Sequence, residues 1–262
     1  MGQLQFDAGR ARSLEAVYLT PDVVAQRARV LDLLGPSVGE RILDIGVGPG
    51  LLAYDLARLV GESGVVAGVD PSSAMIEAAA QRVRDLPHAT MHVGDARALP
   101  FDDGAFDAAV STQVYEYVDD MPRALDELRR VLAPRGRALI LDTDWRSIVW
   151  HSSDAARMER VLSCWDDHLF NPHLPATLGP MLRKAGFIVR RVEILPMLAA
   201  RWQPTSYPGG MFGMIHAYVR EHGDRFGLGP DEIASWYEDQ LNLIRRDEFF
   251  FSVNRYIFVA DR

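Results

Sequence analysis

The sequence contains a single cysteine, Cys164, among its 262 residues. One thiol excludes an intrachain disulfide, a cysteine-based zinc cluster and a redox pair of cysteines. Cys164 lies beside the apolar stripe of a segment with helical periodicity, residues 154–169. We therefore expect it to be a buried packing residue without a catalytic role.

Long hydrophobic runs are also missing, as is an excess of basic residues. No stretch reaches the about 18 apolar residues of a membrane-spanning helix, and the N-terminal segment has no apolar signal core. The 28 basic and 36 acidic residues give a net charge of −8, which disfavours binding to nucleic acid or to an anionic membrane. These absences predict a cytoplasmic protein, a monomer or a homodimer, that binds neither nucleic acid nor membrane.

The sequence does contain an alternation of short apolar strands and amphipathic helices between residues 41 and 142. The predicted strands are Arg41–Ile45, Val65–Val69, Thr90–Val93, Phe106–Ser111 and Ala138–Asp142. The predicted helices between them are Leu51–Val60, Ser73–Leu86 and Met121–Leu132. This alternation is typical of an α/β fold in which helices cover a parallel sheet.

The flanking segments predict further elements of the same single domain, 1–262. Residues 1–40 form a helical cover, in which a helix begins at Thr20-Pro21 and presents an apolar stripe that includes Val24 and Ala28. Residues 143–262 form a second half that carries a helical insertion at about 199–248, before the last strand. Its expected elements are helices at 154–169 and 174–185, a strand at 187–195, helices at 210–222 and 230–246, and a strand at 249–260.

A glycine-rich turn follows the first predicted strand, in the sequence ILDIGVGPG. The strand ends near Asp44, and Gly46, Gly48 and Gly50 let the backbone approach a ligand where α/β sheets bind ligands. The dinucleotide fingerprint G-x-G-x-x-G/A fails, because Leu51 occupies its last position. A nicotinamide-dependent dehydrogenase is thus the weaker alternative. The carboxylate of Asp44 would suit a ligand that carries a cationic group near the turn.

Two further acids follow the next two strands. Asp70 ends the second strand, where a carboxylate can accept hydrogen bonds from both hydroxyls of a ribose. Asp95 follows the third strand on the same rim of the sheet. Three successive strands therefore each present an acid beside one expected pocket.

Five ordered motifs in residues 41–142 resemble those of the class I S-adenosylmethionine-dependent methyltransferases, and more closely the ubiquinone/menaquinone-biosynthesis-like methyltransferase domain. They are LDIGVGPG, GVDPSSAMIEAA, GDARALPF, FDAAVSTQVYEYVDD and LRRVLAPRGRALILD. The resemblance implies a Rossmann-like fold with a mostly parallel seven-stranded sheet flanked by helices. It also implies S-adenosyl-L-methionine as cofactor, with S-adenosyl-L-homocysteine as product.

The resemblance implies roles for four residues around the adenosine half of the cofactor. Asp70 would bind the ribose hydroxyls, and Met75 would cover one face of the adenine. Asp95 would accept a hydrogen bond from the adenine amino group, and Ala96 would donate its backbone amide.

Around the methionine half, the resemblance places Asp44 and the three loop glycines, with Asp44 near the amino group. Gln113 would flank the same end of the cofactor. Tyr18 and Arg27 could close the site over the cofactor carboxylate, although helix packing and surface charge explain these two residues equally well.

The acceptor side is predicted from the aromatic and titratable residues that follow the fifth strand. Trp145 and Trp150 could enclose a planar acceptor, with Asp144 or His151 as the proton acceptor, or both tryptophans could pack in the core. His168 is a third candidate for acid–base catalysis. Its acidic surroundings match no metal-binding signature, so no metal is expected.

The helical insertion adds two weaker candidates for acceptor binding, Tyr207 and His216. The methionines around them have the spacing of a core-facing helical stripe, which explains that segment without a ligand.

These features together predict an S-adenosylmethionine-dependent methyltransferase that acts by direct in-line displacement on a small aromatic or apolar metabolite. Carbon, oxygen and nitrogen acceptors all remain open. The alternatives are a protein or RNA methyltransferase, and a non-catalytic regulator that binds the same cofactor.

Overall fold

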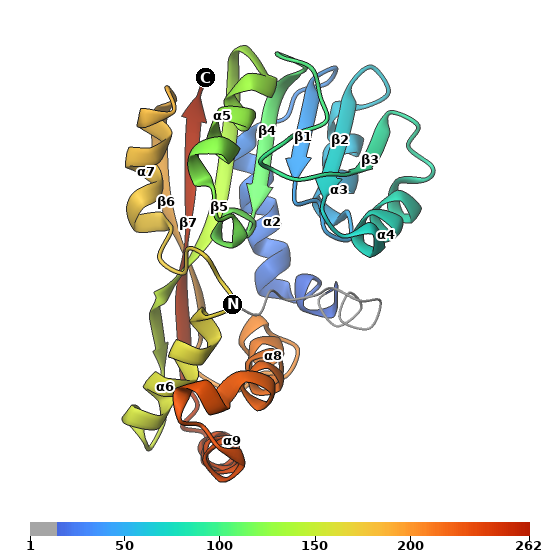
Figure 1. Ribbon diagram of the computed structural model, residues 1–262. Helices are drawn as coiled ribbons and strands as arrows, with labels where there is room; N and C mark the ends of the chain where they lie inside the picture. The colour runs from blue at the N-terminus through green and yellow to red at the C-terminus, as the bar shows by residue number, and fades with distance from the viewer. Residues whose placement is uncertain (1–14) are drawn as a thin grey trace.

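The structure is a computed structural model that describes residues 15–262. Its centre is a seven-stranded sheet with strand order β3-β2-β1-β4-β5-β7-β6, which confirms the predicted sheet (Figure 1). The strands are β1 (Arg41–Ile45), β2 (Val65–Asp70), β3 (Ala89–Val93), β4 (Phe106–Thr112), β5 (Leu132–Trp150), β6 (Ile188–Ala199) and β7 (Phe251–Asp261). Strand β7 runs antiparallel to both of its neighbours, and the other pairs are parallel.

Helices cover both faces of the sheet. They are α2 (Pro21–Leu34), α3 (Leu51–Val60), α4 (Ser73–Val83), α5 (Met121–Val131), α6 (Ala155–Asp166), α7 (Pro175–Lys184), α8 (Tyr207–His222) and α9 (Pro230–Arg245). Two short 3-10 helices are η1 (Tyr115–Tyr117) and η2 (Gly223–Phe226). Helices α2, α3 and α4 share one core with the sheet, and α5 and α7 share another. This two-sided covering is why the parallel strands are almost continuously apolar.

The N-terminal helix α2 buries a different face from the one predicted. Val24 is 40% exposed and Ala28 is exposed, whereas Val23 and Val30 are buried; Leu34, the last residue of the predicted stripe, is buried as expected. The apolar pattern was misleading because the face that meets β5 and β7 includes a polar residue, Gln26, among its buried positions.

Strand β5 is longer than predicted. The predicted end at Asp142 was wrong, because the chain continues as a strand to Trp150 and pairs with β7 down to Phe251. The pairing contains a register shift between Asp144 and Val149. The second half of β5 is held by packing of Trp150 against aromatic rings, which sequence alternation did not reveal.

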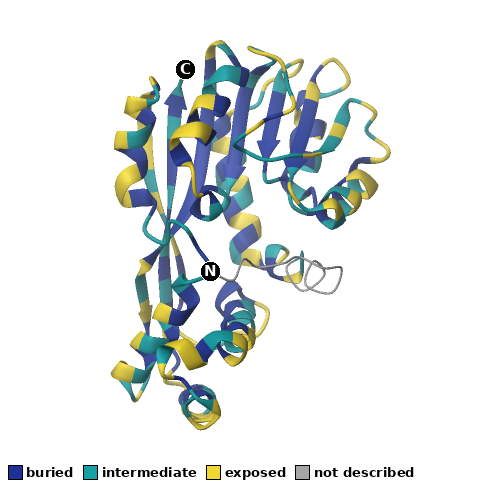
Figure 2. Cartoon of the chain, viewed as in Figure 1, coloured by how far each residue is buried: buried dark blue, intermediate teal, exposed yellow. Residues whose placement is uncertain are grey.

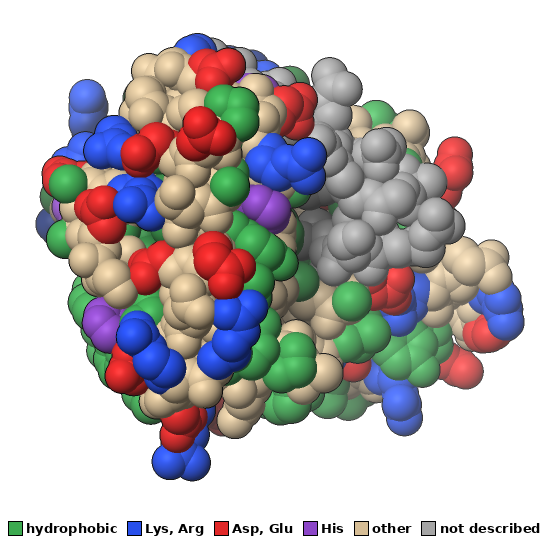
Figure 3. All heavy atoms as spheres, turned by 90° about the horizontal axis from the view of Figure 1, so that it is seen from below, with side chains coloured by type: hydrophobic (Ala, Val, Ile, Leu, Met, Phe, Trp, Pro, Cys, Tyr) green, Lys and Arg blue, Asp and Glu red, His purple; other side chains and the backbone are tan. Residues whose placement is uncertain are grey.

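The long ends of β5, β6 and β7 carry a third core together with α6, α8 and α9 (Figures 1 and 2). We call this part the lower lobe. Its centre includes Trp165 and Trp236, which are 2% and 0% exposed. In chain order, helices α8 and α9 come between β6 and β7, where the helical insertion was predicted. Viewed from below, acidic and basic side chains are interspersed over the surface (Figure 3).

No helix within residues 15–262 combines the length and the apolar character that crossing a membrane requires.

Candidate cofactor and acceptor site

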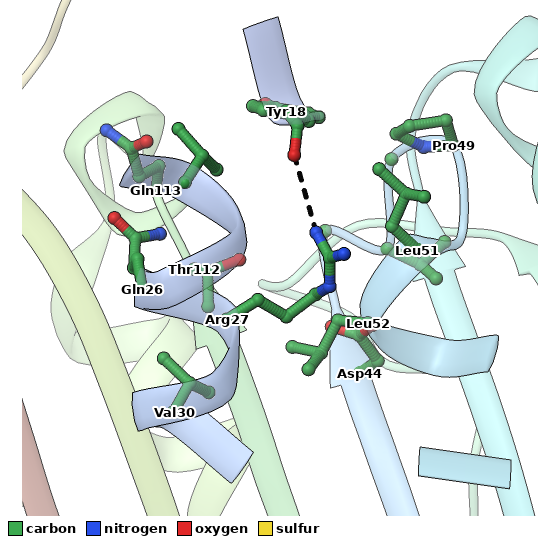
Figure 4. A pocket seen from close by; sticks show the side chains of 14 residues that line it. Tyr18, Gln26, Arg27, Val30, Asp44, Pro49, Leu51, Leu52, Thr112 and Gln113 are labelled. Carbon is green, nitrogen blue, oxygen red and sulfur yellow. Dashed lines mark hydrogen bonds between the residues drawn. The ribbon is translucent and has the colours of Figure 1, made fainter. Parts of the chain in front are cut away.

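A cavity opens at the carboxyl ends of β1 and β4, under the N-terminal end of α2 (Figure 4). The side chains around it come from α2, from the turn between β1 and α3, and from the end of β4. Among its lining residues are Tyr18, Gln26, Arg27, Asp44, Gly48 and Gln113. The cavity therefore lies where parallel α/β sheets bind ligands.

The glycine turn shapes one wall of this cavity. Gly46, Gly48 and Gly50 have φ values of 71°, 51° and 80°, a conformation that glycine adopts without steric cost. A Cβ on Gly46 would lie 2.1 Å from Val114 Cγ2, so side chains are excluded there. A Cβ on Gly48 would instead meet open space, because nothing lies within 4 Å of it. The turn thus leaves backbone open to a ligand at Gly48.

Asp44 contributes a buried carboxylate to the cavity. Asp44 is only 1% exposed, and its Oδ2 atom has no hydrogen-bond partner. Burial raises the pKa of Asp44 to about 8, and the nearby charge of Asp70 adds to the shift. An ammonium group at this place would satisfy the carboxylate and favour its charged form. The residues present therefore fit the amino acid end of S-adenosylmethionine.

Asp70 lies at the rim and fastens the glycine turn. Its Oδ2 accepts from the backbone N–H of Gly48 at 3.0 Å, and its Oδ1 accepts from that of Ser72 at 2.9 Å. Burial raises the pKa of Asp70, and these two hydrogen bonds oppose the shift. Met75 is buried at the start of α4, close to the Ser72 cap.

Asp95 is engaged by a neighbouring cation. Its carboxylate accepts from Arg97 Nε at 2.9 Å and from Arg97 Nη2 at 2.6 Å, which lowers the pKa of Asp95. The four residues predicted around adenosine follow β2 and β3, and none of them lines the cavity: Asp70, Met75, Asp95 and Ala96.

Three other predicted residues do line the cavity. Arg27 donates from Nη1 to the backbone carbonyl of Tyr18 at 3.4 Å, and its Nε is paired with Asp55 at 2.8 Å (Figure 4). Gln113 has a positive φ of 58° and donates from Nε2 to Thr143 Oγ1 at 2.6 Å. The structure thus brings Tyr18, Arg27 and Gln113 together around one space.

Comparison with known proteins identifies the family. A family described as "Methyltransferase domain" matches residues 43–140. A demethylmenaquinone methyltransferase from Symbiobacterium thermophilum is 31% identical over 180 residues, covering 60% of this chain and 72% of the relative. The chain belongs to the class I S-adenosylmethionine-dependent methyltransferases.

Other relatives share a smaller part of their length with this chain. A 2-phytyl-1,4-naphtoquinone methyltransferase from Trichormus variabilis is 44% identical over 111 residues, covering 41% of this chain and 48% of the relative. The chain likewise spans half the length or less of several further curated relatives that it matches.

The fold is also that of solved methyltransferases. Phosphoethanolamine N-methyltransferase 2 from Haemonchus contortus, solved in complex with S-adenosyl-L-methionine, superposes with a TM-score of 0.63 at 23% identity. The superposition covers 98% of this chain and 58% of that chain.

The structure separates the residues predicted for acceptor binding. Trp145 is buried and donates from Nε1 to Glu116 Oε2 at 2.9 Å. Tyr207 is buried with its ring 4.2 Å from the guanidinium carbon of Arg255. Neither residue lines the cavity, although Arg255 is hydrogen-bonded to Gln26, which does.

Trp150 and His216 belong to the lower lobe. Trp150 donates from Nε1 to Gln240 Oε1 at 2.8 Å, and its ring packs edge-on against Trp236. His216 stacks on Tyr237 with ring centroids 4.3 Å apart. Neither residue lines the cavity, so the structure gives both a packing role.

The three candidates for acid–base catalysis also lie outside the cavity. Asp144 is paired with His173 Nδ1. His151 is exposed, and its Nδ1 bonds the backbone carbonyl of Glu248 at 2.9 Å. His168 is buried against aromatic rings, and burial lowers the pKa of His168 to about 4, so it is neutral near pH 7. These placements do not support a direct role in proton transfer.

Nor do the acids near His168 assemble a metal site. Within the described part of the chain, no three histidine, cysteine, aspartate or glutamate side chains converge as metal ligands would.

Sequence reasoning missed a set of buried polar residues next to the cavity: Gln26, Glu116, Asp142 and Arg255. Their signals were present but weak. Arg255 is a lone cation inside an apolar strand pattern, and Glu116 falls within the motif that follows β4. Burial raises the pKa of both Glu116 and Asp142, and the two carboxyl groups interact.

Proposed function

We propose that this chain binds S-adenosyl-L-methionine in the cavity at the ends of β1 and β4 and transfers its methyl group to a small aromatic or apolar acceptor. The observation that carries the proposal is the unpartnered carboxylate of Asp44 beside the open backbone of Gly48, in a chain of this family. The bound cofactor supplies an electrophilic methyl group on a sulfonium, so no covalent protein nucleophile is needed.

In this proposal, the residues of the cavity hold the methionine end. Asp44 binds the amino group, and the N–H groups of the glycine turn face the same end of the ligand. Gln113 flanks the methyl-bearing region, while Arg27 and Tyr18 close the cavity from above through their mutual hydrogen bond. Their common task is orientation, which can supply a large part of the rate acceleration.

The adenosine end extends along the rim past β2 and β3. Asp70 binds the ribose hydroxyls, and Met75 lies against the adenine. The carboxylate of Asp95, oriented by Arg97, and the backbone N–H of Ala96 bind the adenine edge. Each of these side chains follows the carboxyl end of its strand, which supports the assignment.

The acceptor half is proposed to lie toward β5 and β7, where aromatic rings adjoin the cavity. Trp145 and Tyr207 supply apolar surface there; Trp145 Nε1 donates to Glu116, and the ring of Tyr207 faces the guanidinium of Arg255. The names of two relatives refer to quinone substrates, which supports an aromatic, apolar acceptor. The net charge of −8 argues against an RNA acceptor.

The first experiment is a calorimetric titration with S-adenosylhomocysteine, beside NADH and an Asp70→Ala variant. Micromolar binding, about −8 kcal/mol, that the variant weakens supports the cofactor assignment. Binding of NADH alone would instead support a dehydrogenase.

The second experiment incubates the protein and methyl-labelled cofactor with a metabolite extract and, separately, with protein and RNA. Label in an organic-soluble small molecule is expected. Label only in protein or RNA would support a macromolecular acceptor, and cofactor binding without any transfer would support a regulator.

A further inference from the structure

Arg255 of β7 is a buried cation that the roles proposed above leave unexplained. The residue is 1% exposed, and its Nε and Nη2 atoms have no hydrogen-bond partner. Its Nη1 donates to Gln26 Oε1, and the ring of Tyr207 lies 4.2 Å from its guanidinium carbon. No carboxylate oxygen of residues 15–262 lies within ion-pair distance of Arg255, although its charge opposes the rise that burial causes in the pKa of Glu116 and of Asp142. A buried guanidinium with two free donors is costly unless an anion meets it.

The position of Arg255 connects it to the cavity. It lies opposite Thr143 in the antiparallel pairing of β5 and β7, so the two side chains share a face of the sheet. Thr143 Oγ1 accepts from Gln113, and Arg255 is bonded directly to Gln26. Both glutamines line the cavity. Arg255 is therefore bonded to one cavity residue, Gln26. It also pairs across the strands with Thr143, the hydrogen-bond partner of the other cavity residue, Gln113.

Arg255 on β7 is far from Asp44 on β1, the residue proposed to bind the methionine end of the cofactor. Asp44 lies on β1, and the sheet order places β4 and β5 between β1 and β7. The row of Asp44 meets β7 at Val259, four residues from Arg255. With about 4.8 Å between adjacent strands and about 3.3 Å per residue along them, the two residues are about 20 Å apart. A ligand held at Asp44 would thus need a second molecule to reach Arg255. That second molecule is the acceptor.

A buried acid stands next to the same pair of residues. Glu116 Oε2 accepts from Trp145 Nε1 at 2.9 Å and from the backbone N–H of Thr143 at 3.4 Å. Its Oε1 is buried and has no partner. Burial raises the pKa of Glu116 and the charge of Arg255 opposes this rise, so the free carboxylate oxygen and the free guanidinium edge belong to one buried polar cluster.

We propose that Arg255 and Glu116 together bind an acceptor through an ionisable hydroxyl, a phenol or an enol. Glu116 Oε1 receives the hydroxyl proton as the O–H bond breaks, and the electron pair remains on the acceptor as an oxyanion beside Arg255. The acceptor then forms a bond to the methyl group, while the sulfur–methyl bond breaks and its electron pair returns to sulfur. This assignment deepens the proposed function and rests on it.

The test uses 4-nitrophenol, whose anion absorbs visible light, and 4-nitroanisole, which has no ionisable hydroxyl. Both are titrated into the full chain saturated with S-adenosylhomocysteine, one pH unit below the pKa of free 4-nitrophenol. We expect 4-nitrophenol to bind about tenfold more tightly or better, and to bind as its yellow anion. Arg255→Gln should remove the preference and the anion absorption, and leave the affinity for 4-nitroanisole unchanged.

Three further variants make the result specific. Arg190→Gln, an exposed arginine of β6, is the matched control and should behave as the unsubstituted protein. Glu116→Gln should leave the affinity for 4-nitroanisole unchanged and should lower the rate of methyl transfer to 4-nitrophenol, because the amide cannot receive the hydroxyl proton. Arg255→Lys keeps the charge and should retain part of the preference, so the test stands even if Arg255→Gln fails to fold.

Equal affinity for the two probes, no binding of 4-nitrophenol, or a preference that survives in Arg255→Gln would overturn the proposal. Tighter binding of 4-nitrobenzoate than of 4-nitrophenol would also overturn it, because Arg255 would then select a fixed carboxylate. Failure to bind S-adenosylhomocysteine would instead count against the proposed function itself. The two failures are thus distinguishable.

Discussion

At the scale of single residues, the chemistry of the site depends on polar atoms left without partners. Asp44, Glu116 and Arg255 are each 1% exposed, and each has at least one such atom. Buried polar groups are hydrogen-bonded in most proteins, so unpaired ones mark a place for a ligand. The two carboxyl groups have raised pKa values because burial disfavours their charged forms.

Binding of S-adenosylhomocysteine should therefore release a proton from Asp44. The pKa of Asp44 is about 8 in the free protein, so the carboxyl group is mostly protonated at pH 7. The ligand's ammonium group lowers this pKa and expels the proton. Calorimetry at pH 7 in two buffers of different ionisation heat measures the release. Asp44→Asn should bind more weakly and release no proton, whereas Asp32→Asn, at an exposed site, should match the unsubstituted protein.

The same group predicts how the stability of the ligand-free protein depends on pH. Because the folded pKa of Asp44 is raised, its contribution to stability is fully present below about pH 4 and is lost as pH rises toward 8. Thermal unfolding followed across this range should show a smaller decline for Asp44→Asn. An equal decline in both proteins would contradict the raised pKa.

At the scale of elements, the turn from β1 into α3 is the most constrained segment of the site. Gly50 precedes α3 with φ +80°, and a Cβ there would lie 2.8 Å from Ala79 Cα on α4. Ala79 of α4 closes off Gly50, and Val114 closes off Gly46. Of the three turn glycines, only Gly48 would have open space for a Cβ. Packing between two helices thus determines how the cofactor turn is held.

Gly50→Ala should lower the free energy of unfolding by about 1–3 kcal/mol, since it adds backbone strain and a clash with α4. Urea denaturation measures this loss. Gly213 of α8 is the matched control, because its Cβ would meet nothing within 4 Å. Gly213→Ala should stabilise the protein by about 0.5–1 kcal/mol, as expected inside a helix. A Gly50→Ala protein as stable as the original would contradict the geometry.

At the scale of the whole molecule, three strands serve two purposes. The first parts of β5, β6 and β7 complete the sheet, and their other ends carry the lower lobe (Figure 1). The hydrogen bond from Trp150 to Gln240 joins the end of β5 to α9. The lower lobe is thus built on the same strands that carry Thr143 and Arg255.

Trp150→Phe should separate stability from ligand binding. It leaves Gln240 Oε1 without its donor in a buried site, which costs about 1–3 kcal/mol in the free energy of unfolding. The affinity for S-adenosylhomocysteine should not change, because Trp150 does not line the cavity. Denaturation and calorimetry on the same variant test both statements. Weaker binding of the cofactor would show that the lower lobe acts on the site.

The parallel half of the fold and the glycine turn that lines the cavity could be predicted from local sequence. The strand ends at Asp44 and Asp70 follow from short apolar runs, and the glycine turn follows from its composition. Tyr18, Arg27 and Gln113 were placed through resemblance, and the structure brings them to the cavity. The acceptor side was predicted less well, because Trp150, His151 and His216 have aromatic or titratable side chains whose surroundings are set by distant segments.

The sequence by itself determined the order of strands and helices, the glycine turn and the family, because these depend on neighbouring residues and local periodicity. Only the tertiary structure decided that Arg255 bonds Gln26 at the cavity and lies near enough to Glu116 to oppose the rise that burial causes in its pKa. They come from α2, from η1 and from β7, and no repeat or spacing relates them. Their placement depends on the antiparallel register of β5 and β7 and on which face of α2 is buried. Both are set by packing across the sheet.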